Sequence, residues 1–167
     1  MKKTFLLLLV FVLLVSLVGS VSAKSVKTPF TGRGAGFPIQ DPDCTYPGGN
    51  EHCRGMVLLA VNDMSDDRLD GTETSTLNWN FRSVPSPVDL SGPWWGKGQI
   101  VNDAGDVIWD IKFTGERDEQ GFGQLKVVAH GRGDYEGLKA FYTGLRASPF
   151  PWVPFEFSGY ILEQVDG

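Results

Sequence analysis

The sequence predicts an all-β protein, an antiparallel barrel of seven to eight strands. Several segments alternate apolar and polar residues with period 2, which is typical of half-buried strands. Turn residues separate these segments, since the 167 residues include 21 Gly and 10 Pro. The chain also contains 5 Trp, 4 Tyr and 11 Phe, which disordered chains lack. No strong helical periodicity interrupts the strands, and closure into a barrel would protect their edges.

Residues 1–23 are predicted to be a secretory signal peptide. Lys2 and Lys3 precede the apolar run Phe5–Val18, and the small residues Val21–Ala23 form a cleavage site. The run is shorter than the ~20 residues of a membrane-spanning helix. The residue directly after the cleavage site is not a Cys, so we expect no lipid anchor. The sequence therefore predicts a secreted or extracytoplasmic protein of one domain, without a stable membrane anchor once the signal is cleaved.

The predicted processed chain is acidic. Removing Lys2 and Lys3 leaves 13 Lys and Arg against 20 Asp and Glu, a net charge of about −7. Such a domain repels nucleic acid and anionic headgroups at long range, so no nucleic-acid partner is expected. The sequence leaves the oligomeric state open.

The two cysteines, Cys44 and Cys53, are predicted to form a disulfide in an oxidising compartment. A metal site that combines them with His52 is disfavoured, because the C-x-x-C spacing of zinc sites is missing. Gly and Pro signals predict an irregular lead-in with this disulfide loop over residues 24–55, allowing one short strand around Gly34–Ile39. The barrel domain is expected over residues 56–167.

Alternation assigns the inward faces of several strands. Leu77, Trp79 and Phe81 share a face, as do Val107, Trp109, Ile111 and Phe113, while Leu125, Val127 and Ala129 are a first assignment for a third strand. Neighbours on a strand point to opposite faces, so only one of Trp94 and Trp95 can face inward. The strands expected are Met56–Asn62, Thr72–Arg82, Trp94–Val101, Val107–Thr114, Phe122–His130, Leu138–Arg146 and Phe155–Gln164.

A glycine-rich segment carries a family resemblance. Gly131, Gly133, Tyr135 and Gly137 form a Gly-x-Gly-x-aromatic-x-Gly pattern, and Phe157–Leu162 is similar to a closing strand. Together they resemble the allene oxide cyclase-like and dirigent-like barrels, over roughly residues 94–162. The resemblance implies an eight-stranded antiparallel barrel with an apolar cavity, in a family that includes a cyclase and coupling-guidance proteins. It transfers no catalytic residue, because no matched catalytic motif is present.

Polar residues offer few candidates for catalysis or metal binding. His130 at a strand end and the carboxylates Asp106, Asp110, Glu116 and Asp118 have ordinary structural explanations as strand-end and solvated groups. The acidic segment Asn62–Gly71 lacks the D-x-D-x-D-G pattern of a calcium loop and contains Arg68. We therefore expect no catalytic residue, no metal and no cofactor.

The aromatic residues are the best functional lead. Trp79, Trp109, Phe113 and Phe157 are predicted to line a ligand site, although a filled barrel core would also use such residues. The sequence favours a non-enzymatic module that binds a small apolar or amphipathic molecule. One alternative is an isomerase or cyclase of the allene oxide cyclase type, with Glu156, His130 or Tyr142 as its buried polar group. The other is a cell-surface interaction protein that uses an exposed Trp94 or Trp152.

Overall fold

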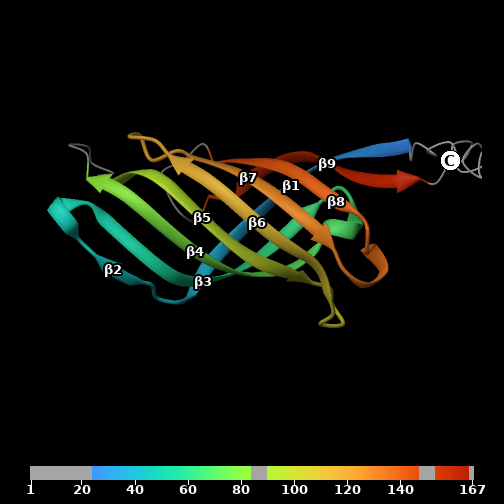
Figure 1. Cartoon of the computed structure of the whole chain (residues 1–167), viewed down its shortest axis with the longest axis horizontal. Coiled ribbons are helices and arrows are strands. Elements are labelled where there is room, and N and C mark those ends of the chain that lie inside the picture. Colours follow the sequence, from blue (N-terminus) through green and yellow to red (C-terminus); the bar gives the residue numbers. More distant parts are fainter. Residues whose placement is uncertain (1–23, 84–89, 147–152, 166–167) are drawn as a thin grey trace, which may run out of the picture.

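The computed structural model describes residues 24–83, 90–146 and 153–165, which form one antiparallel sheet of nine strands (Figure 1). No α-helix occurs in this part of the chain, and three single turns of 3-10 helix join strands. The strands are β1 (Lys24–Gln40), β2 (Asp43–Thr45), β3 (Glu51–Met64), β4 (Gly71–Ser83), β5 (Leu90–Val101), β6 (Val107–Arg117), β7 (Gly123–Gly131), β8 (Lys139–Arg146) and β9 (Phe155–Val165). The short turns are η1 (Pro47–Gly49), η2 (Asp67–Leu69) and η3 (Gly133–Tyr135).

The sheet closes into a ring, which confirms the predicted antiparallel barrel. Its order is β1-β9-β8-β7-β6-β5-β4-β3-β2, and an additional pairing joins β1 to β3. Eight strands therefore form the ring, while β2 pairs only with the start of β3. The strand β1 closes the ring in two halves: Lys24–Gly34 pairs with β9, and Gly32–Gln40 pairs with β3. Only three residues, Gly32 to Gly34, are paired on both sides.

The long strand β1 differs from the irregular lead-in that Gly and Pro predicted for this segment. Pro29 and Pro38 lie in the halves of β1 that pair on one side only, where a missing N–H is tolerated as on an edge strand. Gly32 and Gly34 lie where β1 approaches β3 most closely, because a Cβ on either would collide with Met64 or Asn62. The glycines that suggested a loop thus permit ring closure.

Inward-facing residues follow the predicted alternation. In β6, Trp109, Ile111 and Phe113 are buried, and in β7 every second residue from Gly123 to Gly131 is buried. They belong to one core cluster that also includes Phe30, Met64, Leu69, Ile100, Ala140, Tyr142 and Ile161. Trp94 packs against this core, whereas Trp95 lies outside with the Arg54 guanidinium 4.9 Å from its ring centroid.

Several inward aromatic rings lie opposite a glycine of the neighbouring strand. The register pairs Trp94 with Gly115, Phe113 with Gly96, Tyr142 with Gly159 and Phe157 with Gly144. A Cβ on any of these glycines would collide with its aromatic partner. The glycines therefore leave room for large rings to lie across the adjacent strand inside a narrow ring of strands.

No helix in the described ranges is both long and apolar enough to span a membrane.

Candidate ligand-binding end of the barrel

The two ends of the barrel are built differently. One end, which we call the arginine end, is formed by the β2–β3 hairpin and the last residues of β4, β6 and β8, at the left of Figure 1. The other, which we call the plugged end, carries η2, η3 and the β5–β6 turn. Inward-facing charged side chains define the first, and large buried side chains fill the second.

Arg117 and Arg146 face the interior at the arginine end. Arg117 continues the inward series Trp109, Ile111 and Phe113 of β6, and Arg146 continues the buried series of β8. In the register both pair with Gly123 of the intervening strand β7. That position carries no side chain, and the Phe155 ring packs over it. Adjacent strands lie about 4.8 Å apart, so the two Cα atoms are separated by roughly 10 Å along the sheet.

Among the described residues, no ion pair gives either guanidinium group a compensating charge. The Nε atoms of Arg117 and Arg146 are buried without a hydrogen-bond partner. Neither residue takes part in any of the ion pairs found among the described residues. Burial, together with the nearby charge of Arg117, lowers the pKa of Arg146. Since arginine stays charged at any physiological pH, both groups bring positive charge to this end of the interior.

Aromatic rings surround the two arginines. The Arg146 Cζ lies 4.9 Å from the ring centroid of Phe155, and the Arg117 Cζ lies 5.9 Å from that of Phe81. A chain of rings then leads inward, because the centroids of Phe155 and Phe157 are 6.2 Å apart and those of Phe155 and Trp94 are 5.9 Å apart. Phe155, Trp94 and Phe81 are only half-buried. The arginine end thus combines cationic groups with accessible apolar surface.

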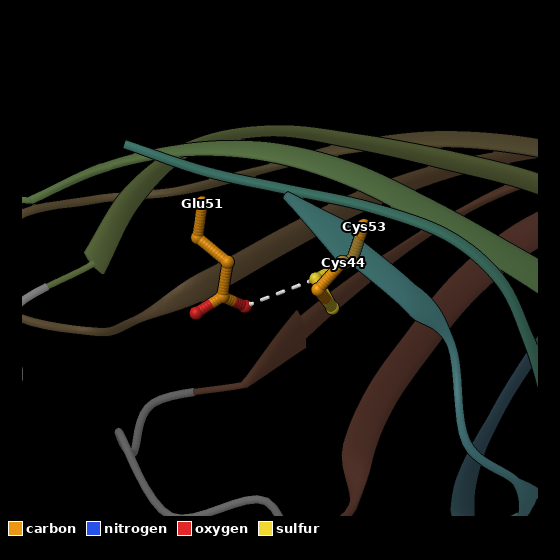
Figure 2. A group of neighbouring side chains, drawn as sticks. All are labelled: Cys44, Glu51 and Cys53. Atoms are coloured by element: carbon orange, nitrogen blue, oxygen red, sulfur yellow. Dashed lines mark hydrogen bonds between the residues drawn. A yellow bond between two sulfur atoms is a disulfide. The ribbon is translucent and has the colours of Figure 1, made fainter. Parts of the chain in front are cut away.

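The β2–β3 hairpin contributes a disulfide and a carboxylate to the same end. Cys44 and Cys53 pair directly across the hairpin and are disulfide-bonded, as predicted. Glu51 Oε1 lies 3.4 Å from Cys53 Sγ (Figure 2), a contact without a shared proton because the sulfur is oxidised. The same oxygen accepts a 2.6 Å hydrogen bond from Trp79 Nε1. The side chains of Cys44, Glu51 and Cys53 lie close enough together to hold a metal ion. The disulfide, however, removes the thiolates that would bind it.

A second polar group lies deeper inside the barrel. Asn62 Nδ2 donates a 3.2 Å hydrogen bond to Glu73 Oε2, and Asn62 and Ser75 are both buried. Burial raises the pKa of Glu73, against the opposing effect of hydrogen bonds from Asn62 and Ser75. Burial also raises the pKa of Tyr142, and the charge of Glu73 adds to that effect. The interior therefore holds a carboxyl group whose charged form is destabilised by burial.

In the described part of the chain, large buried side chains fill the plugged end. Leu69 of η2 and Trp109 are both fully buried, and Trp109 Nε1 donates a 2.6 Å hydrogen bond to the Arg68 carbonyl. Tyr135 of η3 stacks on Trp109 with ring centroids 5.8 Å apart. Outside this plug lies a hollow of about 470 Å³ bordered by acidic side chains; they are Asp67, Asp70, Asp106 and Asp134.

The structure brings some of the predicted ligand-site residues together and separates others. Phe113 and Phe157 lie inside the barrel, next to Trp94 and Phe155 respectively. Trp79 lies further out at the arginine end, stacked on Phe81. Trp109 belongs to the plugged end, away from that group. The four residues share an inward face, but three of them surround the arginine end and one fills the other.

Other candidates from the sequence lie elsewhere. His130 is exposed beside Asp110, at an outer-surface hollow of about 570 Å³ over β4 to β7. Asp110 lies there between Gln99 and Arg132. In the acidic segment, Asp66 binds Arg68, and Asp70 accepts a hydrogen bond from Met64 N. Glu156 is exposed and Tyr142 is buried; Trp152 falls outside the described residues.

Sequence reasoning missed Arg117, Arg146 and Glu73. The predicted strand Val107–Thr114 stops short of Arg117, although the position of Arg117 in the alternation is the same as that of Trp109, Ile111 and Phe113. Glu73 likewise shares the face of Leu77 and Trp79. Extending the alternation to the strand ends would have placed both side chains inside. The convergence of Arg146 with Arg117 depends on the register across β7, which periodicity does not provide.

Comparison with known proteins found no relative of this chain. No protein-family model, no curated protein and no solved structure matches the chain.

Proposed function

We propose that this protein binds a small amphipathic molecule in the arginine end of its barrel, outside the cytoplasm. The observation that carries the proposal is the incomplete burial of inward-facing aromatic rings at this end, beside a plugged opposite end. Phe155, Trp94 and Phe81 remain half-buried although they point inward. Ligand sites in small barrels combine such apolar walls with a few fixed polar groups.

The extracytoplasmic location is part of the proposal. The disulfide between Cys44 and Cys53 supports it, because disulfides persist in oxidising compartments. The signal-like residues 1–23 are the sequence feature that agrees with it.

Native mass spectrometry of the purified protein tests the proposal. We expect a reproducible mass above that of the bare chain, and release of the corresponding small molecule when the protein is denatured and extracted. The variant Trp94→Ala should lose this adduct, whereas Trp95→Ala, which changes the neighbouring outward-facing ring, should keep it. A bare mass in every preparation, together with no uptake of added amphiphiles, would contradict the proposal.

A second candidate is an isomerase or cyclase, which is favoured by the interior group of Glu73, Asn62 and Tyr142. A carboxyl group with a raised pKa, in the same interior as a buried phenol that its charge influences, can act in proton transfer. This candidate agrees with the proposed resemblance to allene oxide cyclase-like barrels. Conversion of an unstable epoxide with altered stereochemistry, lost in Glu73→Gln, would support it; unchanged product composition would argue against it.

A further inference from the structure

We propose that Arg117 and Arg146 form a clamp for the anionic headgroup of the ligand, so that the protein selects amphiphiles ending in a carboxylate. This inference rests on the proposed function, because it specifies which amphiphiles enter the same end of the barrel. The apolar part of the ligand would lie along the inward chain of Phe155, Phe157 and Trp94. The headgroup would lie between the two guanidinium groups.

The local geometry supports a two-sided clamp. Arg117 and Arg146 stand on either side of Gly123 in one cross-strand row, and both face inward. A Cβ at position 123 would lie 3.2 Å from the Phe155 ring and 3.8 Å from Arg146 Nε. The glycine thus leaves room for the Phe155 ring, which packs over it beside Arg146. Cation–π contacts place the Arg117 guanidinium beside Phe81 and the Arg146 guanidinium beside Phe155.

An anion would satisfy the two arginine side chains better than a neutral group would. A buried, charged side chain without a partner is costly, and a carboxylate would accept the unused N–H groups of both arginines. The two Nε atoms are already removed from water without a hydrogen bond. The carboxylate of Glu51, on the hairpin at this end, is bound to the Trp79 indole. No ion pair among the described residues neutralises either arginine.

The net charge of the protein makes this local charge informative. The chain carries a formal charge of −5 and has acidic side chains outside the plugged end. Two cations facing the interior are therefore not part of a generally basic surface. An acidic protein would repel an anionic amphiphile at long range, so its affinity must come from contacts inside the barrel.

The test compares an acid with its uncharged analogue. We would titrate the purified protein with 11-(dansylamino)undecanoic acid and with its methyl ester, and follow dansyl emission, which rises in an apolar environment. The native protein should bind the acid at least 10-fold more tightly than the ester at pH 7. The variant R117Q/R146Q should lose this preference through weaker acid binding, with ester binding changed less than about twofold.

A matched control removes the same charges from the outer face. Lys112 and Lys126 are exposed on β6 and β7, so K112Q/K126Q should keep the native preference for the acid. Acetate in excess should not displace the acid, because a free anion lacks the apolar contacts; displacement would indicate a site for small anions and contradict the proposed clamp for amphiphiles.

The outcomes separate this inference from the proposed function. Equal binding of acid and ester by the native protein would overturn the clamp but leave the amphiphile site in place. Binding of neither probe would overturn both. If R117Q/R146Q does not fold, the preference of the native protein and the conservative variant R117K/R146K, which should retain it in part, still decide the question.

Discussion

The plugged end and the arginine end use similar aromatic residues for opposite purposes. At the plugged end, Trp109 is fully buried, bonded through its indole N–H to Arg68 and covered by Tyr135. At the arginine end, Trp94 and Phe155 touch each other but stay only half-buried, beside two arginines whose Nε atoms have no hydrogen-bond partner. Satisfied polar groups and complete burial indicate a structural role, whereas unsatisfied cations and incomplete burial indicate a site that a ligand completes.

Truncating the plug should have the largest effect on stability. Trp109→Ala removes a fully buried ring and leaves the Arg68 carbonyl without its donor, so we expect a loss of about 3–5 kcal/mol in the free energy of unfolding. Trp94→Ala should cost less than about half as much, because that ring is partly exposed. Urea unfolding measures both. Equal losses would mean that the two ends do not differ as described.

Removing the disulfide should have the next largest effect. The bond joins residues nine positions apart, and closing such a short loop restricts the unfolded chain by about 2.5 kcal/mol. We expect the double variant Cys44→Ser, Cys53→Ser to lose about that amount in chemical unfolding. Reduction of the native protein should reproduce the loss, and an unchanged unfolding midpoint in the reductant would show that the hairpin stabilises little.

Removing an arginine of the clamp should stabilise the ligand-free protein. Arg146→Met replaces a half-buried cation, whose Nε has no hydrogen-bond partner, by an apolar side chain, so we expect a gain of about 1 kcal/mol. Lys126→Met, on the exposed face of β7, should change stability by less than about 0.5 kcal/mol. Thermal unfolding of the two variants provides the comparison; a clear destabilisation by Arg146→Met would show that this arginine serves the fold.

Glu73→Gln should produce a small effect whose size depends on pH. The raised pKa means that the folded protein holds the Glu73 proton more tightly than the unfolded chain. Stability from this group is therefore complete below the ordinary glutamate pKa and is lost as pH rises through the raised value. The Gln variant, which keeps an acceptor for Asn62, should match the native protein at pH 4 and exceed it at pH 8. A difference that is constant with pH would refute this account.

The sequence predicted the sheet better than the site. Period-2 alternation identified the inward faces of β6 and β7, because a single buried face leaves a clear pattern in Trp109, Ile111 and Phe113. It missed the length of β1, since Pro29 and Gly32 indicate loops unless the one-sided pairing of that strand is known. Which end is plugged depends on Leu69 and Tyr135 meeting Trp109 from distant turns, and such contacts are not encoded in local patterns.

The same limit applies to the arginines. A charged residue at a strand end is normally assigned to solvent. Only the register through Gly123 brings Arg117 and Arg146 into one cross-strand row. The sequence does place both arginines on the inward face of the alternation. This position indicates an interior side chain only once the strands are known to close into a ring.

The most direct measurement is an NMR titration that follows the Nε–Hε resonances of the arginine side chains as 11-(dansylamino)undecanoic acid is added. If the arginine end receives the ligand, the resonances of Arg117 and Arg146 should shift in a saturable manner, while those of Arg68 and Arg132 at the plugged end should stay in place. Saturable shifts of Arg68 or Arg132 with Arg117 and Arg146 unmoved would contradict the assignment of the two ends.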